Sequence, residues 1–213
     1  MNNKSSFVGT RIGFLFAALA TLIWSGNFLV ARGLNLEIDP ISLAFWRWTV
    51  ASIIVFPIAI KSMVEQRNLL RRHILYFLMA SILGITVFNT LIYIGGETSS
   101  ALNLSLISIT FPVFTIILSR LIFKEPITGQ KIIGVLIIVS GVLLLITKGN
   151  LQMLLNLDFV EGDLWMLLAS LIFAVYSLLV GQRPVEIKPI SFLGTTFLVG
   201  WLFLAVAFFI GTD

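Results

Sequence analysis

The sequence predicts an all-α integral membrane protein with about seven transmembrane helices. Of its 213 residues, 58% are hydrophobic and only 11% are charged, compared with about 25% charged residues in soluble domains. The mean hydropathy is +1.05. The apolar residues form long continuous runs, whereas the strands of an outer-membrane barrel alternate between apolar and polar residues. This composition excludes a soluble globular domain and a disordered chain.

Seven apolar runs are long enough to cross a bilayer as helices, which takes about 20 residues each. The first run continues beyond residues 24–27 without a small-residue cleavage site before a polar domain, so we interpret it as a span and not as a cleavable signal. Charged segments separate the second run from the third and the fourth from the fifth, and the weakly apolar residues 151–161 connect the fifth with the sixth. The predicted spans are residues 12–33, 41–60, 74–95, 100–123, 129–147, 163–182 and 190–211.

The distribution of Lys and Arg predicts the orientation. With a cytoplasmic N-terminus, the outer loops hold only Arg32 and Lys148, and Arg47 lies within a span. The other eleven fall in cytoplasmic segments: Lys4, Arg11, Lys61, Arg67, Arg71, Arg72, Arg120, Lys124, Lys131, Arg183 and Lys188. Cytoplasmic loops of membrane proteins collect basic residues. We therefore expect a multi-pass protein of the cell (inner or plasma) membrane, with Asp213 outside. The net charge of +4 then needs no nucleic-acid partner.

The sequence contains an internal repeat at an offset of 149 residues. Residues 37–42 (EIDPIS) return as residues 186–191 (EIKPIS), and 12 of the 30 positions from Gly13 to Ser42 are identical in the second copy. Five predicted spans precede the second copy, an odd number, so that copy enters the membrane from the opposite side. Inverted repeats of this kind are typical of secondary transporters, which bind solutes between the halves.

The repeat predicts the domain organisation. We expect residues 1–148 to form a first five-helix repeat and residues 149–161 an extracytoplasmic linker. Residues 162–213 would then form the first two helices of an incomplete second repeat. A protein with two complete repeats would have ten spans, so the chain is expected to be truncated after about seven of them.

Four motifs occur in order along the chain: residues 22–28 (LIWSGNF), 40–47 (PISLAFWR), 112–115 (PVFT) and 123–130 (FKEPITGQ). Their sequences and order resemble those of the drug/metabolite transporter superfamily, EamA type. The resemblance implies a secondary carrier that moves small metabolites such as amino acids, related solutes or drugs, with export as the expected direction. A non-transporting truncated protein, or an assembly partner of another membrane protein, is the alternative.

The residues also argue against an enzyme. The chain has no Cys and a single histidine, His73. No cluster of Asp, Glu, His or Cys lies at one membrane face, where a membrane enzyme would need it. We therefore expect neither a metal site nor a cofactor.

Arg47 is the only charged residue well inside a span. A buried arginine costs about 2.5–3.5 kcal/mol on insertion scales, so it needs a role. It either contacts an anionic group of the solute or acts as a structural clamp on backbone carbonyls or on Glu97.

Further cavity candidates come from polar stripes and from the repeat. Thr86, Asn89 and Tyr93 share one helical face with Glu97, and such a face either lines a cavity or bonds a neighbouring helix. Trp24 and Asn27 have Phe173 and Tyr176 at the equivalent positions of the second copy. The candidates for the substrate cavity are Trp24, Asn27, Arg47, Thr86, Asn89, Tyr93, Asn103, Thr110 and Tyr176.

Four residues are expected to have structural roles. Pro112 frees a backbone carbonyl in the fourth span, and Glu125 caps the loop after it. Gly134 and Gly141 lie on one helical face and should form a packing surface. The expected partners are the lipid bilayer and a small-molecule solute, together with a second copy of the chain or further helices that complete the second repeat.

Overall fold

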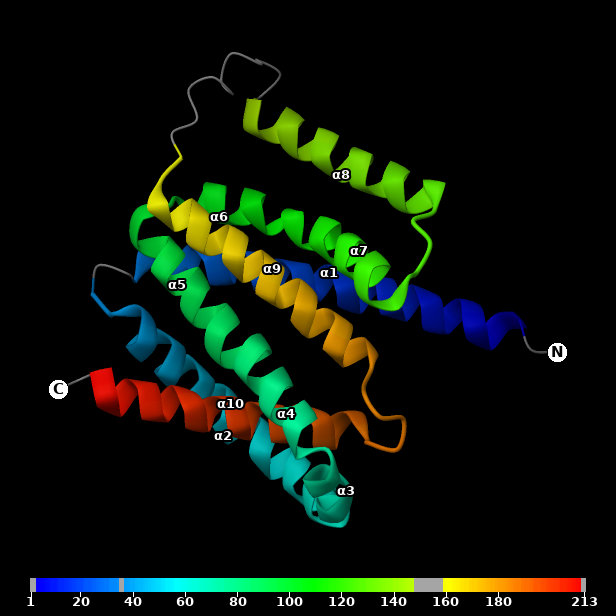
Figure 1. The fold of residues 1–213 in the computed structure, drawn as a ribbon, viewed down its shortest axis with the longest axis vertical. Helices are drawn as coiled ribbons and strands as arrows, with labels where there is room; N and C mark the ends of the chain where they lie inside the picture. The colour runs from blue at the N-terminus through cyan, green and yellow to red at the C-terminus, as the bar shows by residue number, and fades with distance from the viewer. Residues whose placement is uncertain (1–2, 35–36, 148–158, 212–213) are drawn as a thin grey trace.

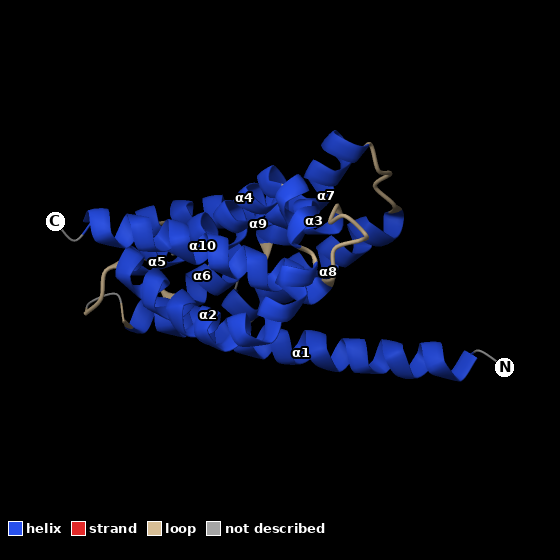
Figure 2. Ribbon diagram, turned by 90° about the horizontal axis from the view of Figure 1, so that it is seen from below, coloured by secondary structure: helices blue, strands red, loops and turns tan. Residues whose placement is uncertain are grey.

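A computed structural model describes residues 3–34, 37–147 and 159–211. These parts of the chain contain helices and loops, and none of their residues is in a strand (Figures 1 and 2). Most of the expected linker and Asp213 lie outside the described residues. The elements are α1 (Asn3–Gly33), α2 (Pro40–Glu65), α3 (Arg67–Arg72), α4 (Ile74–Ser81), η1 (Ile82–Val87), α5 (Phe88–Thr98), α6 (Ala101–Ser108), α7 (Thr110–Phe123), α8 (Gly129–Thr147), α9 (Glu161–Gly181) and α10 (Pro189–Gly211).

The helices confirm the predicted all-α membrane protein. Within the described residues, six helical segments are long and apolar enough to cross a bilayer. The fifth predicted run forms α8, whose described apolar part, Gly129–Gly141, is shorter than a full span. Many large apolar side chains of α1, α2 and α8 are exposed, as expected of surfaces that contact lipid. Helix α2 continues through Lys61 to Glu65, beyond the approximate end of the predicted second span.

The third span is one continuous rod with a π-helical segment, η1, between α4 and α5. The side-chain amide of Asn89 donates to the carbonyl oxygens of Gly84 and Ile85, at 3.2 and 2.9 Å. The side-chain amide thus donates to backbone carbonyl oxygens at the point where the regular α-helical hydrogen bonds are interrupted. Thr86 lies within η1 and bonds to Gly200 on α10, whereas Asn89 and Tyr93 on α5 contact Arg47.

The fourth span is broken at Ile109 into α6 and α7. Pro112 has no N–H and so cannot donate to the carbonyl of Ser108 four residues earlier. Near the break, the Thr110 hydroxyl donates to the carbonyl of Ile107 at 2.7 Å. Pro112 thus lies in the first turn after the break, and the Thr110 hydroxyl at the start of α7 bonds back to the last turn of α6.

The spans pack into a bundle in which α2 and α10, from equivalent positions of the sequence repeat, make the most extensive contact. Helix α9 packs against α5 on one side and α6 and α7 on the other, and α8 lies beside α7 at the edge of the bundle (Figure 1). The core between these helices includes the buried side chains of Tyr93, Leu104, Met166 and Leu204.

Two glycines allow α5 and α9 to approach closely. A Cβ at Gly162 would lie 2.2 Å from the carbonyl oxygen of Gly95, which is closer than any real contact. In contrast, a Cβ at Gly134 or Gly141 would meet no described atom within 4 Å. The expected packing surface on α8 is therefore not formed against any described residue.

Polar contacts tie the helix ends together at each side of the bundle. At one side, Lys188 pairs with Glu65 at 2.9 Å, and the side chain of Gln66 bonds to the backbone of Glu186 and Lys188. At the other side, Arg32 donates to the carbonyl oxygens of Gly96 and Glu97. The end of α2 and the α9–α10 loop therefore lie together, opposite the end of α1.

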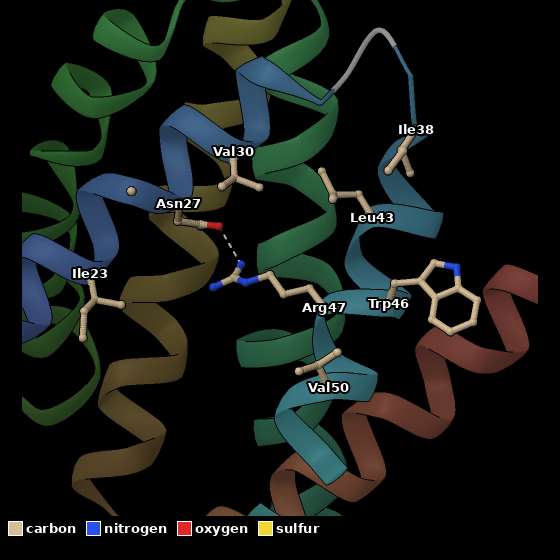
Figure 3. Close-up of a pocket in the computed structure, with 9 residues that line it drawn as sticks. Ile23, Asn27, Val30, Ile38, Leu43, Trp46, Arg47 and Val50 are labelled. Carbon is tan, nitrogen blue, oxygen red and sulfur yellow. Dashed lines mark hydrogen bonds between the residues drawn. The ribbon is translucent and has the colours of Figure 1, made fainter. Parts of the chain in front are cut away.

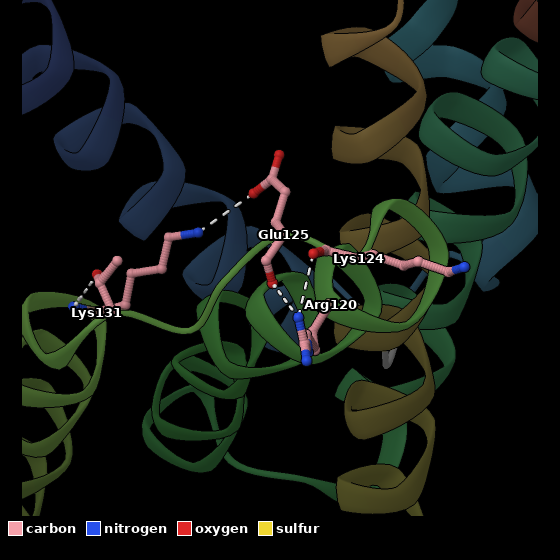
Figure 4. A network of polar contacts seen from close by, with 5 residues as sticks. Arg120, Lys124, Glu125 and Lys131 are labelled. Atoms are coloured by element: carbon pink, nitrogen blue, oxygen red, sulfur yellow. Dashed lines mark hydrogen bonds and ion pairs between the residues drawn. The ribbon is translucent and has the colours of Figure 1, made fainter.

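The loop between α7 and α8 is held by a network of its own (Figure 4). Arg120 donates to the carbonyl oxygens of Lys124 and Glu125, and the Glu125 carboxylate pairs with Lys131 at 3.3 Å. Hydrogen bonding to Ser119 and the charge of Lys131 hold the pKa of Glu125 below its ordinary value. Glu125 thus holds the loop through its carboxylate, which contacts Ser119 and Lys131, and through its backbone oxygen, which accepts from Arg120.

Candidate functional site

Arg47 on α2 lies at the centre of a polar cluster built from three spans. One terminal nitrogen, Nη1, donates to the side-chain oxygens of Asn27 on α1, at 2.6 Å, and Asn89 on α5, at 3.3 Å. The same nitrogen donates to the hydroxyl of Tyr93. The Tyr93 hydroxyl in turn donates to Asn27 at 3.1 Å. The cluster therefore joins α1, α2 and α5 around one guanidinium group.

Helix geometry accounts for this arrangement. Asn89 and Tyr93 are four residues apart on α5, so their side chains project from the same face. Both are buried, at 4% and 1% exposure. Arg47 begins two turns inside α2, and its long aliphatic stem carries the charge across to α1 (Figure 3). Every side chain that accepts a hydrogen bond from Arg47 is neutral.

A pocket of about 560 Å³ opens beside the cluster, between α1 and α2 (Figure 3). This volume lies within the range of small-molecule sites, about 300–1,000 Å³. Most of the wall is apolar, and among the described lining residues Arg47 supplies the one charged group. The lining residues are Ile23, Gly26, Asn27, Val30, Ile38, Leu43, Trp46, Arg47 and Val50.

The cluster contains four of the predicted cavity residues: Asn27, Arg47, Asn89 and Tyr93. Trp24 lies near Asn27 on α1 but contacts Phe173, with ring centroids 5.3 Å apart.

Three of the other candidates lie outside the Arg47 cluster. Thr86 donates to the carbonyl of Gly200 on α10 at 3.2 Å. The Tyr176 ring on α9 lies against Gly84, where an added Cβ would come within 2.4 Å of it. Asn103 is half-buried on α6, outside the pocket lining.

The proposed structural clamp on Glu97 or on backbone carbonyls was wrong for Arg47, because all its hydrogen bonds in the described structure go to side chains. Arg32 makes the backbone contacts near Glu97 instead. Sequence reasoning placed Arg32 in an outer loop and gave it no role. The signal in the sequence that could have pointed to Arg32 is its position in the last turn of α1.

Sequence reasoning also missed Asp163, which is buried at 3% exposure near the start of α9. Its carboxylate accepts hydrogen bonds from the Ser99 hydroxyl and from the backbone N–H of Val160. An acidic residue in the first turn of a helix is a recognisable capping signal. Asp163 therefore joins the start of α9 to the end of α5.

Comparison with known proteins identifies the class. Residues 11–147, which include the whole cluster and pocket, match the EamA-like transporter family. The chain belongs to this family. The family's description is that of transporters, and the relatives reported below are themselves named transporters.

The EamA-like chain has bacterial and archaeal relatives. It is 31% identical to the uncharacterized transporter YyaM of Bacillus subtilis over 169 residues, 79% of this chain and 55% of the relative. It is 28% identical to an uncharacterized transporter of Archaeoglobus fulgidus over 194 residues, 89% of this chain and 64% of the relative. The chain thus spans less than two thirds of each relative's length. No solved structure matches it.

Proposed function

We propose that this EamA-like chain is a secondary carrier for small metabolites and that the solute binds in the pocket beside Arg47. The main observation is a guanidinium group held between three spans by the neutral side chains of Asn27, Asn89 and Tyr93. An ionisable residue inside a membrane span, next to an apolar pocket of ligand size, is taken as a candidate functional residue.

The sequence repeat supports a carrier mechanism. We propose that residues 1–148 and 162–213 belong to two repeats of opposite orientation, with residues 149–161 as the linker. The close contact of the equivalent helices α2 and α10 supports this arrangement. In such proteins one repeat rocks against the other around a site near the midplane.

The same proposal covers the solutes, the direction of transport and the location of the carrier. The solutes are amino acids or related metabolites and drugs, the direction is export, and the location is the cell membrane with a cytoplasmic N-terminus. The pocket opens on exposed faces of α1 and α2. We propose that these faces are covered in the working carrier by additional helices or by a second copy of the chain.

Release of solute from loaded vesicles tests this function. Proteoliposomes containing the chain would be loaded with a defined mixture of amino acids and organic acids, and each solute released would be measured by mass spectrometry. We expect saturable release of at least one solute, reduced at least about tenfold by Arg47→Gln. The matched control, Arg120→Gln, removes an arginine from the α7–α8 loop and should leave release unchanged. Release equal to that of protein-free vesicles would overturn the carrier proposal and favour the non-transporting alternative.

A further inference from the structure

We infer that the Arg47 pocket selects solutes with a single carboxylate on an aliphatic body, in preference to their zwitterionic, neutral and cationic analogues. The inference narrows the solutes of the proposed carrier from amino acids and related metabolites to carboxylates without an ammonium group, and it rests on that function for its role in transport. Binding to the pocket is nevertheless a separate property, and it can be measured without any flux.

The first argument is the unused hydrogen-bonding capacity of Arg47. A guanidinium group carries five N–H donors in a planar fork and has no acceptor. All three hydrogen bonds of Arg47 in the described structure leave from Nη1. Its Nε and Nη2 atoms have no hydrogen-bond partner among the described residues. The fork geometry matches the two oxygens of a carboxylate, which a lysine or an amide side chain would match less well.

The second argument is the lack of a counter-charge. Asn27, Asn89 and Tyr93 position the guanidinium group, but none of them carries a negative charge. Arg47 forms no salt bridge with any described Asp or Glu. The Arg47 side chain is exposed in the open pocket, beside apolar side chains. When the proposed additional helices or second copy cover this face, the local dielectric constant falls and the cation attracts an anion strongly. We therefore expect the solute to supply the anionic group that pairs with Arg47.

The third argument is the composition of the wall. The side chains of Ile23, Val30, Leu43 and Val50 surround Arg47 (Figure 3). They suit a short aliphatic body. The described lining contains no Asp or Glu to receive an ammonium group. An amino acid would therefore bury its ammonium group without a charged partner, which is costly. The corresponding acid without the amino group avoids this cost.

A matched ligand series on one carbon skeleton tests the inference. The ligands are 4-methylpentanoate, its amide, leucine (which adds an ammonium group to the same acid) and 4-methylpentylamine. Binding to the chain in lipid nanodiscs would be measured by isothermal titration calorimetry, with heats from empty nanodiscs subtracted. We expect 4-methylpentanoate to bind at least about tenfold more tightly than each of the other three. The amide lacks the charge-assisted hydrogen bonds, which are about twice as strong as neutral ones. Leucine and the amine would place an ammonium group in the pocket without a charged partner.

Two variants connect this preference with Arg47. Arg47→Gln should make the acid and the amide bind alike, whereas Arg120→Gln should retain the preference for the acid. If Arg47→Gln does not fold, as judged by circular dichroism, the comparison of ligands on the unmodified chain still decides. Equal or tighter binding of leucine or the amide would overturn the inference. So would a preference for the acid that persists in folded Arg47→Gln.

The outcomes also separate this inference from the carrier proposal. If the acid binds selectively but no solute is released from vesicles, the inference stands and the carrier proposal fails. If vesicles release leucine at a rate that Arg47→Gln does not change, the chain is a carrier and the inference fails.

Discussion

The indole ring of Trp48 on α2 contacts the phenyl ring of Phe197 on α10 edge to face, with centroids 4.8 Å apart. These positions are 149 residues apart, which is the offset of the sequence repeat. Trp24 and Phe173 have the same offset and also touch. Two positions exchanged by a two-fold axis can touch only close to that axis. The two pairs therefore support the proposed inverted repeat and indicate where its axis runs.

Contacts away from the axis occur in reciprocal pairs. Phe45 on α2 stacks on Phe208 of α10 at 4.4 Å. Adding the offset to Phe45 and subtracting it from Phe208 gives Gly194 and Ala59, and these two residues also meet. A Cβ at Gly194 would lie 2.4 Å from the Cβ of Ala59. The same crossing is thus filled by two aromatic rings at one end and by two small residues at the other.

The small pair predicts a mutation and its rescue. Gly194→Ala should destabilise the fold by about 1–3 kcal/mol, because the added methyl group overlaps Ala59 and Met63. Ala59→Gly in the same chain should recover a large part of this loss. The measurement is the thermal unfolding midpoint of the purified chain in detergent. Equal stability of Gly194→Ala and the unmodified chain would show that α2 and α10 are not packed at this distance.

A second prediction compares glycines at equivalent repeat positions. Gly162→Ala should be strongly destabilising, because the new Cβ would overlap the backbone oxygen of Gly95, which cannot move as a flexible side chain can. Gly13→Ala is the matched control, since no described atom lies within 4 Å of its Cβ position. It should be neutral or stabilise α1 by up to about 1 kcal/mol. Similar unfolding midpoints for the two variants would contradict the close crossing of α5 and α9.

The buried amide of Asn89 provides a third prediction. Asn89→Leu removes the donor to the carbonyl oxygens of Gly84 and Ile85 and an acceptor of Arg47. The expected loss is about 1–3 kcal/mol, the cost of leaving buried polar groups unpaired. Hydrogen exchange should accelerate at η1 more than at α10. Uniform acceleration over both elements would indicate global destabilisation without a specific role in η1.

Much of the fold was predictable from composition, because a run of apolar residues must form a helix to satisfy its backbone in a bilayer. The π-segment η1 was not predictable. The side-chain amide of Asn89 bonds to the carbonyl oxygens of Gly84 and Ile85 within it, and no periodicity in the sequence specifies these bonds. Gly134 was assigned to a packing surface from its spacing alone, but spacing does not say whether a neighbouring helix covers that face.

The site was predictable in part for the same reason. Periodicity placed Asn89 and Tyr93 on one face, and the cost of a buried charge identified Arg47. The partners of Arg47 depend on how α1, α2 and α5 pack together, which no local pattern contains. For this reason the sequence pointed to Glu97 as a partner of Arg47. In the structure the backbone oxygen of Glu97 accepts a hydrogen bond from Arg32 instead.

The contacts at the helix ends predict which loops share a membrane side. The Glu65–Lys188 ion pair places the end of α2 and the α9–α10 loop together. The excess of Lys and Arg predicts that this side is cytoplasmic. Reporter fusions at Arg67, Gln130 and Lys188 should therefore read as cytoplasmic, and a fusion at Glu37 as external. Opposite signals at Arg67 and Lys188 would contradict the structure, whereas a joint external signal would reverse only the orientation.

The last prediction concerns Asp39, which caps the start of α2 outside the membrane span. Its carboxylate accepts hydrogen bonds from the backbone N–H groups of Ile41 and Ser42, at 3.1 and 2.9 Å. Burial raises the pKa of this carboxyl, but the hydrogen bonds to Ser42 and Ile41 lower it more, to below its ordinary value of 3.8. A pKa that is lower in the folded state means that the ionised cap stabilises the fold above the unfolded pKa. This contribution is lost as the pH falls through the folded pKa.

Asp39→Ala should accordingly reduce the free energy of unfolding by about 1 kcal/mol at pH 7, the usual value of an N-cap. The difference from the unmodified chain should shrink as the pH falls below about 4, where the carboxylate becomes protonated. Asp39→Asn is the matched control, because its side-chain oxygen caps α2 without titrating. The measurement is the unfolding midpoint in detergent at pH 7 and pH 3. A difference between Asp39→Ala and the unmodified chain that is the same at both pH values would show that the charge of Asp39 contributes nothing to the cap.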